Sequence, residues 1–141
     1  MKTEPTDLDR RAAQLFVPRR GMRVWFTEPG AEERACTVLE FSPSRCNWDA
    51  KQPRAWVAWD GSGGACGWVR LAYASAIDTD DPATVGCMLA QVETEAGPVS
   101  MTWDRWSDGQ EHYVIRYGDR WRGPTRATAL VAAMRALKPA P

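Results

Sequence analysis

Apolar and polar positions alternate in short runs through residues 21–77, and a period of two is typical of β-strands. The runs are separated by polar or glycine-rich turns such as Asp60–Gly64. The strands that this pattern predicts are residues 22–26, 35–41, 54–59, 66–70 and a last short pairing near Ile77, which follows one helical turn. Because many short strands with glycine-rich turns favour sheet closure, we expect a small five-stranded barrel.

Residues 7–16 are predicted to form a short helix in front of the barrel. Thr6 is a plausible N-cap, and Asp7 and Asp9 lie in the first turn, where the helix dipole favours acids. The apolar residues share one face and should dock on the body that follows.

A second unit is expected after a polar segment. Residues 85–94, 99–106 and 112–117 are interpreted as three antiparallel strands, and residues 118–123 as a turn that carries Trp121. A helix begins at Pro124 or Thr125 and ends at Lys138. The predicted fold class is therefore α+β and β-dominated: a short N-terminal helix, a small five-stranded barrel, and a three-stranded meander covered by one C-terminal helix.

The corresponding domain organisation has four segments. These are an N-terminal helix and arm (1–20), the barrel (21–77), a linker (78–84) and a β-β-β-α unit (85–138). The linker holds Asp78, Asp80 and Asp81, which we interpret as a solvated acidic run rather than as metal ligands.

The barrel segment resembles a Tudor/KOW-type small β-barrel. The residues that carry the resemblance are Gly21 and Val24, Thr37-Val38, Val57 with Trp59-Asp60-Gly61, Gly67-Trp68-Val69 and Leu71. Members of this group bind peptides, modified side chains, nucleic acid or partner proteins, so the resemblance implies a binding function. It also raises the possibility of an aromatic cage, for which rings are available from Trp25, Phe26, Trp56, Trp59 and Trp68. The insertion at 42–53 is longer than such barrels usually carry.

The C-terminal unit is weakly similar to HicB-like antitoxin domains and to the arm-binding domains of phage integrases. The similarity rests on the β-β-β-α order and on the pattern that starts at Gly123-Pro124-Thr125. It implies a small bacterial or phage module, and no functional residue is transferred from it.

Composition adds one strong signal, because the chain has eight tryptophans in 141 residues. So small a body should leave some indole rings half-exposed on a recognition surface. Charge is segregated although the net charge is zero: residues 1–26 and 101–141 are basic, and 27–100 are acidic. A bipolar chain of this kind can bind itself as a homodimer, a basic partner or nucleic acid.

Enzyme signatures are poor. The single histidine, His112, would have to pair with one of four cysteines to make a nucleophile. The cysteines lack the spacing of a zinc site and are expected as reduced thiols, although a Cys36–Cys46 disulfide is possible in an oxidising compartment. We expect no metal, no cofactor and no catalytic residue. With no signal peptide or membrane segment, the expected location is the cytoplasm.

The best candidate for a binding surface is a Trp/Arg cluster in the last forty residues or so, where guanidinium groups and aromatic rings alternate. Its members are Arg116, Arg120, Trp121, Arg122, Arg126, Trp106 and Tyr117. The alternative is that this open sheet face packs on the barrel. A secondary basic patch consists of Arg10, Arg11, Arg19, Arg20 and Arg23. The alternative is an exposed helix edge that pairs with the acidic middle segment within the molecule or in a dimer.

These features lead to one expectation and one alternative for function. The chain is expected to be a non-catalytic binding protein, an accessory protein of a phage or mobile element that engages a host macromolecular complex such as a defence system through a Trp/Arg surface. A protein partner is favoured. The alternative is direct nucleic-acid binding through the C-terminal sheet and the basic patches.

Overall fold

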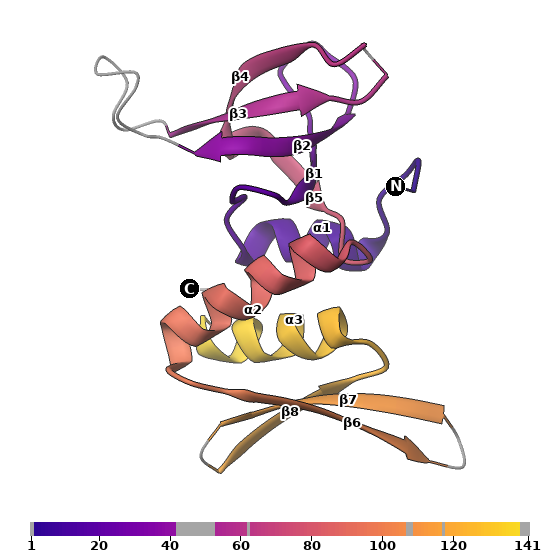
Figure 1. Cartoon of the computed structure of the whole chain (residues 1–141), viewed down its shortest axis with the longest axis vertical. Coiled ribbons are helices and arrows are strands. Elements are labelled where there is room, and N and C mark those ends of the chain that lie inside the picture. The colour runs from indigo at the N-terminus through magenta and orange to yellow at the C-terminus, as the bar shows by residue number, and fades with distance from the viewer. Residues whose placement is uncertain (1, 42–52, 62, 107–108, 117, 139–141) are drawn as a thin grey trace. The chain divides into compact units, whose positions relative to one another are not determined.

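A computed structural model of the chain describes residues 2–41, 53–61, 63–106, 109–116 and 118–138. The expected loop with Trp48 and Cys46, and the candidate Tyr117, lie outside these residues. The chain divides into two compact units, Met1–Thr84 and Val85–Pro141. Taken together, the described residues form an α+β fold in which strands predominate, as the sequence predicts (Figure 1).

Unit 1 is built on a five-stranded antiparallel sheet in the order β4-β3-β2-β1-β5. The strands are β1 (Arg23–Phe26), β2 (Arg34–Phe41), β3 (Arg54–Trp59), β4 (Cys66–Arg70) and β5 (Ala74–Ile77), and a 3-10 turn, η2 (Leu71–Tyr73), precedes β5. The first four strands were predicted within one residue of these bounds. The last was expected only as a pairing near Ile77, and it begins earlier, at Ala74, because the helical turn before it ends at Tyr73.

The sheet must curl, because η2 connects its two edge strands. In a flat sheet β4 and β5 would lie about 19 Å apart, four strand spacings, whereas the four Cα steps from Arg70 to Ala74 reach at most about 14 Å. Both ends of the connection are fastened: Leu71 N–H donates to Pro53 C=O and Thr27 N–H donates to Tyr73 C=O, each at 2.9 Å. This curl places the side chains of Val24, Val38 and Val57 in a fully buried core.

Helix α1 (Asp7–Leu15) begins at the predicted cap, where the Thr6 side chain accepts the Asp9 N–H. It packs against β5. Trp25 and Ala76 are register partners on the face of β1 and β5 opposite to Val24 and Ile77. Trp25 and Ala76 are buried, as are Val24 and Ile77, so both faces of β1 are covered.

Unit 2 contains a three-stranded antiparallel sheet in the order β6-β7-β8. Its strands are β6 (Ser100–Trp106), β7 (Gly109–Arg116) and β8 (Asp119–Gly123), and helix α3 (Arg126–Leu137) starts at Thr125. The covering C-terminal helix is confirmed. The prediction that 118–123 is a turn is wrong, because these residues form the edge strand β8 apart from Gly118.

The predicted strand at 85–94 is also wrong, because it lies within helix α2 (Pro82–Ala96). Its buried residues Val85, Met88 and Val92 follow helical spacing rather than alternation. Asp81 caps the helix by accepting the Thr84 N–H at 3.0 Å, and Gly97, with φ of +78°, follows its end. Unit 2 therefore has the order α-β-β-β-α.

Candidate binding surfaces

The outer face of the β3–β4 hairpin gathers two tryptophans and two arginines. Trp56 is the register partner of Trp68, and Arg54 of Arg70. Side chains alternate along a strand, so these four share one face, while Ala55 and Val69 point to the buried core. We call Arg54, Trp56, Trp68 and Arg70 the Trp–Arg face.

The two indole rings of the Trp–Arg face contact each other. Their centroids lie 5.1 Å apart with an interplanar angle of 57°. All four side chains are half-buried, so each keeps part of its surface in solvent. A pair of large rigid rings flanked by guanidinium groups has the composition of a binding hot spot.

A β-bulge in β2 extends this face with an apolar residue. The β2–β3 register shifts between Val38 and Glu40, which leaves Leu39 without a register partner and puts Glu40 opposite Trp56. Leu39 is 39% exposed. The neighbouring strand β2 therefore adds an exposed apolar side chain, Leu39, and places Glu40 beside Trp56.

The five rings available for an aromatic cage do not converge. Trp25 is buried on the face of β1 opposite to Phe26. Phe26 and Trp59 meet edge to face at 6.3 Å, and the Arg34 guanidinium carbon lies 4.3 Å from the centroid of the Trp59 ring. Trp56 and Trp68 occupy the outer face. The five rings are thus distributed over three places in unit 1. The contact of Arg34 with the Trp59 ring joins two residues of the same chain.

The register of unit 2 divides the predicted C-terminal cluster between two faces of the sheet. A Cβ atom added to Gly123 would come within 2.5 Å of Thr128 Cβ, so the Gly123 face of β8 is the one that α3 covers. Trp121 shares that face, whereas Arg120 and Arg122 alternate to the opposite one. Arg126 is exposed at the start of α3.

Arg116 and Trp121, both members of the predicted cluster, lie close to each other. Arg116 pairs with Asp119 at 2.7 Å, and its guanidinium carbon lies 5.9 Å from the centroid of the half-buried Trp121 ring. Trp106 is the register partner of Gly109 at the far end of β6. Among the described side chains of the predicted cluster, Arg116 and Trp121 therefore lie together, whereas Arg120 and Arg122 lie on the other face of the sheet.

Sequence reasoning did not select Trp103, which is the most exposed large apolar side chain in the described residues, at 58%. It lies on the edge strand β6 opposite His112. Helix α3 packs mainly against β8 and β7, so it covers this part of β6 less than it covers the other two strands. The position of a strand within its sheet decides this exposure, and the sequence pattern does not report it.

The secondary basic patch is partly neutralised within unit 1. Arg10 makes two hydrogen bonds to Glu33, at 3.1 and 3.2 Å, and Arg23 bonds to Asp60 and Thr37. Arg11, Arg19 and Arg20 are exposed. For Arg10 and Arg23 the alternative of pairing with the acidic middle segment is confirmed.

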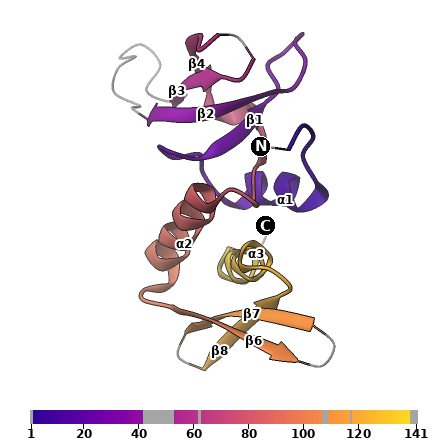
Figure 2. The same ribbon diagram turned by 45° about the vertical axis from the view of Figure 1, so that its right-hand side comes forward.

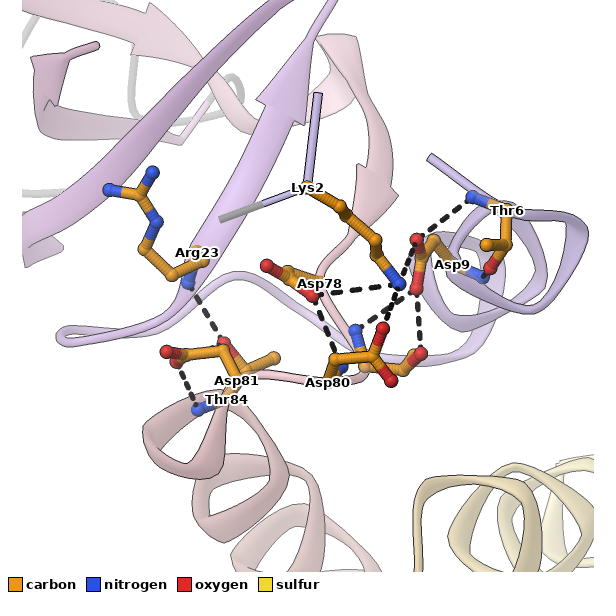
Figure 3. Close-up of polar contacts among 9 residues, drawn as sticks. Lys2, Thr6, Asp9, Arg23, Asp78, Asp80, Asp81 and Thr84 are labelled. Atoms are coloured by element: carbon orange, nitrogen blue, oxygen red, sulfur yellow. Dashed lines mark hydrogen bonds and ion pairs between the residues drawn. The ribbon is translucent and has the colours of Figure 1, made fainter. Parts of the chain in front are cut away.

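The 78–84 segment is solvated only in part: the Asp80 side chain is 75% exposed, but other residues of the segment are buried. Asp78, Thr79 and Thr84 are 3%, 5% and 0% exposed. Lys2 Nζ lies 2.8 Å from Asp9 Oδ2, 2.7 Å from Asp80 Oδ2 and 3.6 Å from Asp78 Oδ1 (Figure 3). The segment thus fastens the N-terminal arm and α1 to the end of β5, and the Thr84 hydroxyl accepts the Arg23 N–H at 2.9 Å.

Two carboxyl groups of this cluster have opposite pKa shifts. Burial raises the pKa of Asp9, but hydrogen bonds from Lys2, Thr79 and Thr6 outweigh it, so its pKa is lowered. At Asp78 burial is the largest effect and raises the pKa. The hydrogen bond from the Asp80 N–H and the charge of Lys2 lower the pKa of Asp78, but by less. The cluster is an internal ion-pair network of unit 1.

The chemistry available to the described residues is limited. Cys36 is a free, fully buried thiol that contacts Val24 C=O at 3.4 Å, and the other residue of the possible Cys36–Cys46 disulfide lies outside the described residues. Burial raises the pKa of Cys36 to about 12, which disfavours the nucleophilic thiolate. No three His, Cys, Asp or Glu side chains in the described ranges are placed to hold a metal ion.

Comparisons with protein families, with curated proteins and with solved structures find no match for this chain. No helix within the described ranges has both the length and the apolar character needed to cross a membrane.

Proposed function

We propose that this chain is a non-catalytic binding protein that contacts a partner protein through the Trp–Arg face of unit 1. The observation that carries the proposal is the pairing of Trp56 with Trp68 on the solvent side of the β3–β4 hairpin, with ring centroids 5.1 Å apart. Indole rings that face solvent gain free energy when a partner covers them, and tryptophan and arginine dominate interface hot spots.

The hairpin suits this role because its other face is locked in the core. Val57 and Val69 are buried, and Ala55 is fully buried. The rings are therefore presented on a backbone that is already ordered, which lowers the entropic cost of association. The half-exposed Arg54 and Arg70 at one end favour a partner that carries acidic groups opposite the hairpin.

Two residues support a non-catalytic role in this proposal, the thiol of Cys36 and the single histidine, His112. The fully buried Cys36, with its pKa raised to about 12, is a poor nucleophile. His112 lies on β7, and its register partner on β6 is the exposed Trp103. A histidine on a surface strand is common in proteins that have no catalytic role. In this proposal the protein acts by binding to a surface of its partner. An accessory protein of a phage or mobile element would bind a host complex in this way.

The test compares the wild type with three variants, all tagged, in quantitative affinity capture from cells in which the chain is made. Trp56→Ala/Trp68→Ala removes the rings, and Trp103→Ala removes an exposed indole elsewhere as the matched control. We expect a protein that the wild type and the control retain and that the double variant loses. Arg54→Glu/Arg70→Glu keeps the rings and should lose the same protein, so a folding defect caused by ring removal cannot explain both results.

A further inference from the structure

The sheet of unit 2 has one face that no described element of that unit covers. Figures 1 and 2 show α2 and α3 on the same side of β6, β7 and β8. The close approach of Gly123 to Thr128 and Ala129 identifies the covered face. The other face, here called the open face, carries Arg120 and Arg122 on β8, because side chains alternate along a strand.

The two arginines of the open face are arranged along an edge strand. They are two positions apart, so their Cα atoms are separated by about 6.6 Å, and both are exposed. Arg120 is also held in place: its guanidinium carbon lies 4.4 Å from the centroid of the Tyr113 ring. Tyr113 is 5% exposed, and its hydroxyl donates to Glu111 at 2.9 Å.

Ion pairing inside the chain leaves this strand basic. In unit 1 the acidic residues neutralise Lys2, Arg10 and Arg23. Within the described part of unit 2, ion pairs join Arg116 to Asp119 and Lys138 to Glu95. Arg120 and Arg122 belong to neither pair, so the zero net charge of the chain conceals a local positive strip on β8.

We propose that β8 binds the phosphate backbone of a nucleic acid through Arg120 and Arg122. Guanidinium groups form two parallel hydrogen bonds with phosphate, and two of them in line on a rigid strand match a polyanion of regular charge spacing. Tyr113 is buried under Arg120 and offers no face on which a base could stack. The contact should therefore be with phosphates alone and should not depend on base sequence.

The open face also carries acidic residues on β6 and β7, and these limit the proposed phosphate contact to β8. Asp104 and Glu111 are register partners on β6 and β7, and they share the face with Tyr113 and Arg122. A nucleic acid that crossed the sheet would meet these carboxylates. The backbone should therefore run along β8, and the footprint should include only a few phosphates.

The experiment is fluorescence anisotropy with labelled single-stranded and duplex oligonucleotides of two unrelated sequences, at about 50 and 200 mM salt. The variant Arg120→Ala/Arg122→Ala is compared with Arg105→Ala/Arg135→Ala, which removes two exposed arginines that lie off the open face. We expect the wild type to bind both sequences alike, with affinity that falls steeply with salt. The open-face variant should weaken binding by at least about tenfold and lower the salt slope by about 2, and the control should stay close to the wild type.

Three results would overturn the proposal. One is no binding at the lower salt concentration. Another is an equal loss in both double variants, which would mean that only net charge matters. The last is preferential binding of a polyglutamate competitor over the oligonucleotides, which would assign the strip to an acidic protein. Circular dichroism of each variant verifies that the folded state is retained, and Arg120→Lys/Arg122→Lys, which keeps the charge, should recover part of the affinity.

Discussion

Trp56 and Trp68 lie directly opposite each other on β3 and β4, on the side of the hairpin that faces away from the core of unit 1. Side-chain alternation places the buried Ala55, Val57 and Val69 behind them. Each of these two strands therefore contributes to the core with one face and carries a half-buried tryptophan on the other.

Removal of a buried indole should cost far more stability than removal of an exposed one. Trp25 is 2% exposed and Trp103 is 58% exposed. Trp25→Ala should lower the free energy of unfolding by about 3–5 kcal/mol, and Trp103→Ala by less than about 0.5 kcal/mol. Urea denaturation followed by circular dichroism measures both. Comparable losses at the two positions would contradict the assigned burial.

Gly123 should not tolerate a side chain. An alanine Cβ atom there would lie 2.5 Å from Thr128 Cβ and 2.9 Å from Ala129 N. Because one of these neighbours is helix backbone, Gly123→Ala should destabilise unit 2 by about 1–3 kcal/mol. Gly86 in α2 is the matched control, since nothing lies within 4 Å of its added Cβ atom. Gly86→Ala should stabilise the helix by about 0.5–1 kcal/mol, and a loss there would show that α2 is misplaced.

The ion pair between Lys2 and Asp9 should make the stability of unit 1 depend on pH. The pKa of Asp9 is lowered on folding, so its contribution is present above the ordinary value near 3.8 and is lost as the pH falls through the folded-state pKa. The pKa of Asp78 is raised, so this group protonates first and its protonation does not weaken the fold.

Lys2→Met tests this network at two pH values. At pH 7 the variant should be about 1–3 kcal/mol less stable than the wild type, because the buried Asp9 loses a charged hydrogen-bond partner. The difference should shrink at a pH below the folded-state pKa of Asp9, where that carboxyl group is neutral. Guanidinium denaturation curves measure it; a difference that is constant across pH would contradict the ion-pair account.

Two cysteines should differ sharply in reactivity. Cys36 is fully buried with a pKa raised to about 12, whereas Cys66 is exposed. Iodoacetamide at about pH 8 should therefore modify Cys66 in the native protein and leave Cys36 unmodified until the protein is unfolded. Peptide mass spectrometry reads out both sites. Rapid labelling of native Cys36 would show that the core of unit 1 opens readily.

The sequence predicts the strands of unit 1 well because each is short, alternates clearly and ends at a turn residue. It predicts α3 for a similar reason, since Thr125 caps it and Ala127, Leu130 and Met134 form one buried stripe. The error at 85–94 arose because Gly86 weakens the helical pattern. Asp81, Pro82 and Gly97 are nevertheless ordinary helix start and stop signals.

The candidate surfaces are harder to predict, because they depend on register. Arg120, Trp121 and Arg122 are neighbours in sequence, but alternation in β8 sends the indole to one face and the guanidinium groups to the other. Trp56 and Trp68 are distant in sequence, and the β3–β4 register brings them together. A prediction of a Trp/Arg surface can follow from composition, but its location requires the pairing of strands.

The most direct test of the central proposal is covalent footprinting of tryptophan in the presence and absence of the captured partner. Oxidative labelling with mass spectrometry reports the solvent accessibility of Trp56, Trp68 and Trp103 in one experiment. We predict that the partner protects Trp56 and Trp68 and leaves Trp103 as accessible as before. Unchanged labelling of Trp56 and Trp68 in the saturated complex would contradict the assignment of the Trp–Arg face as the contact surface.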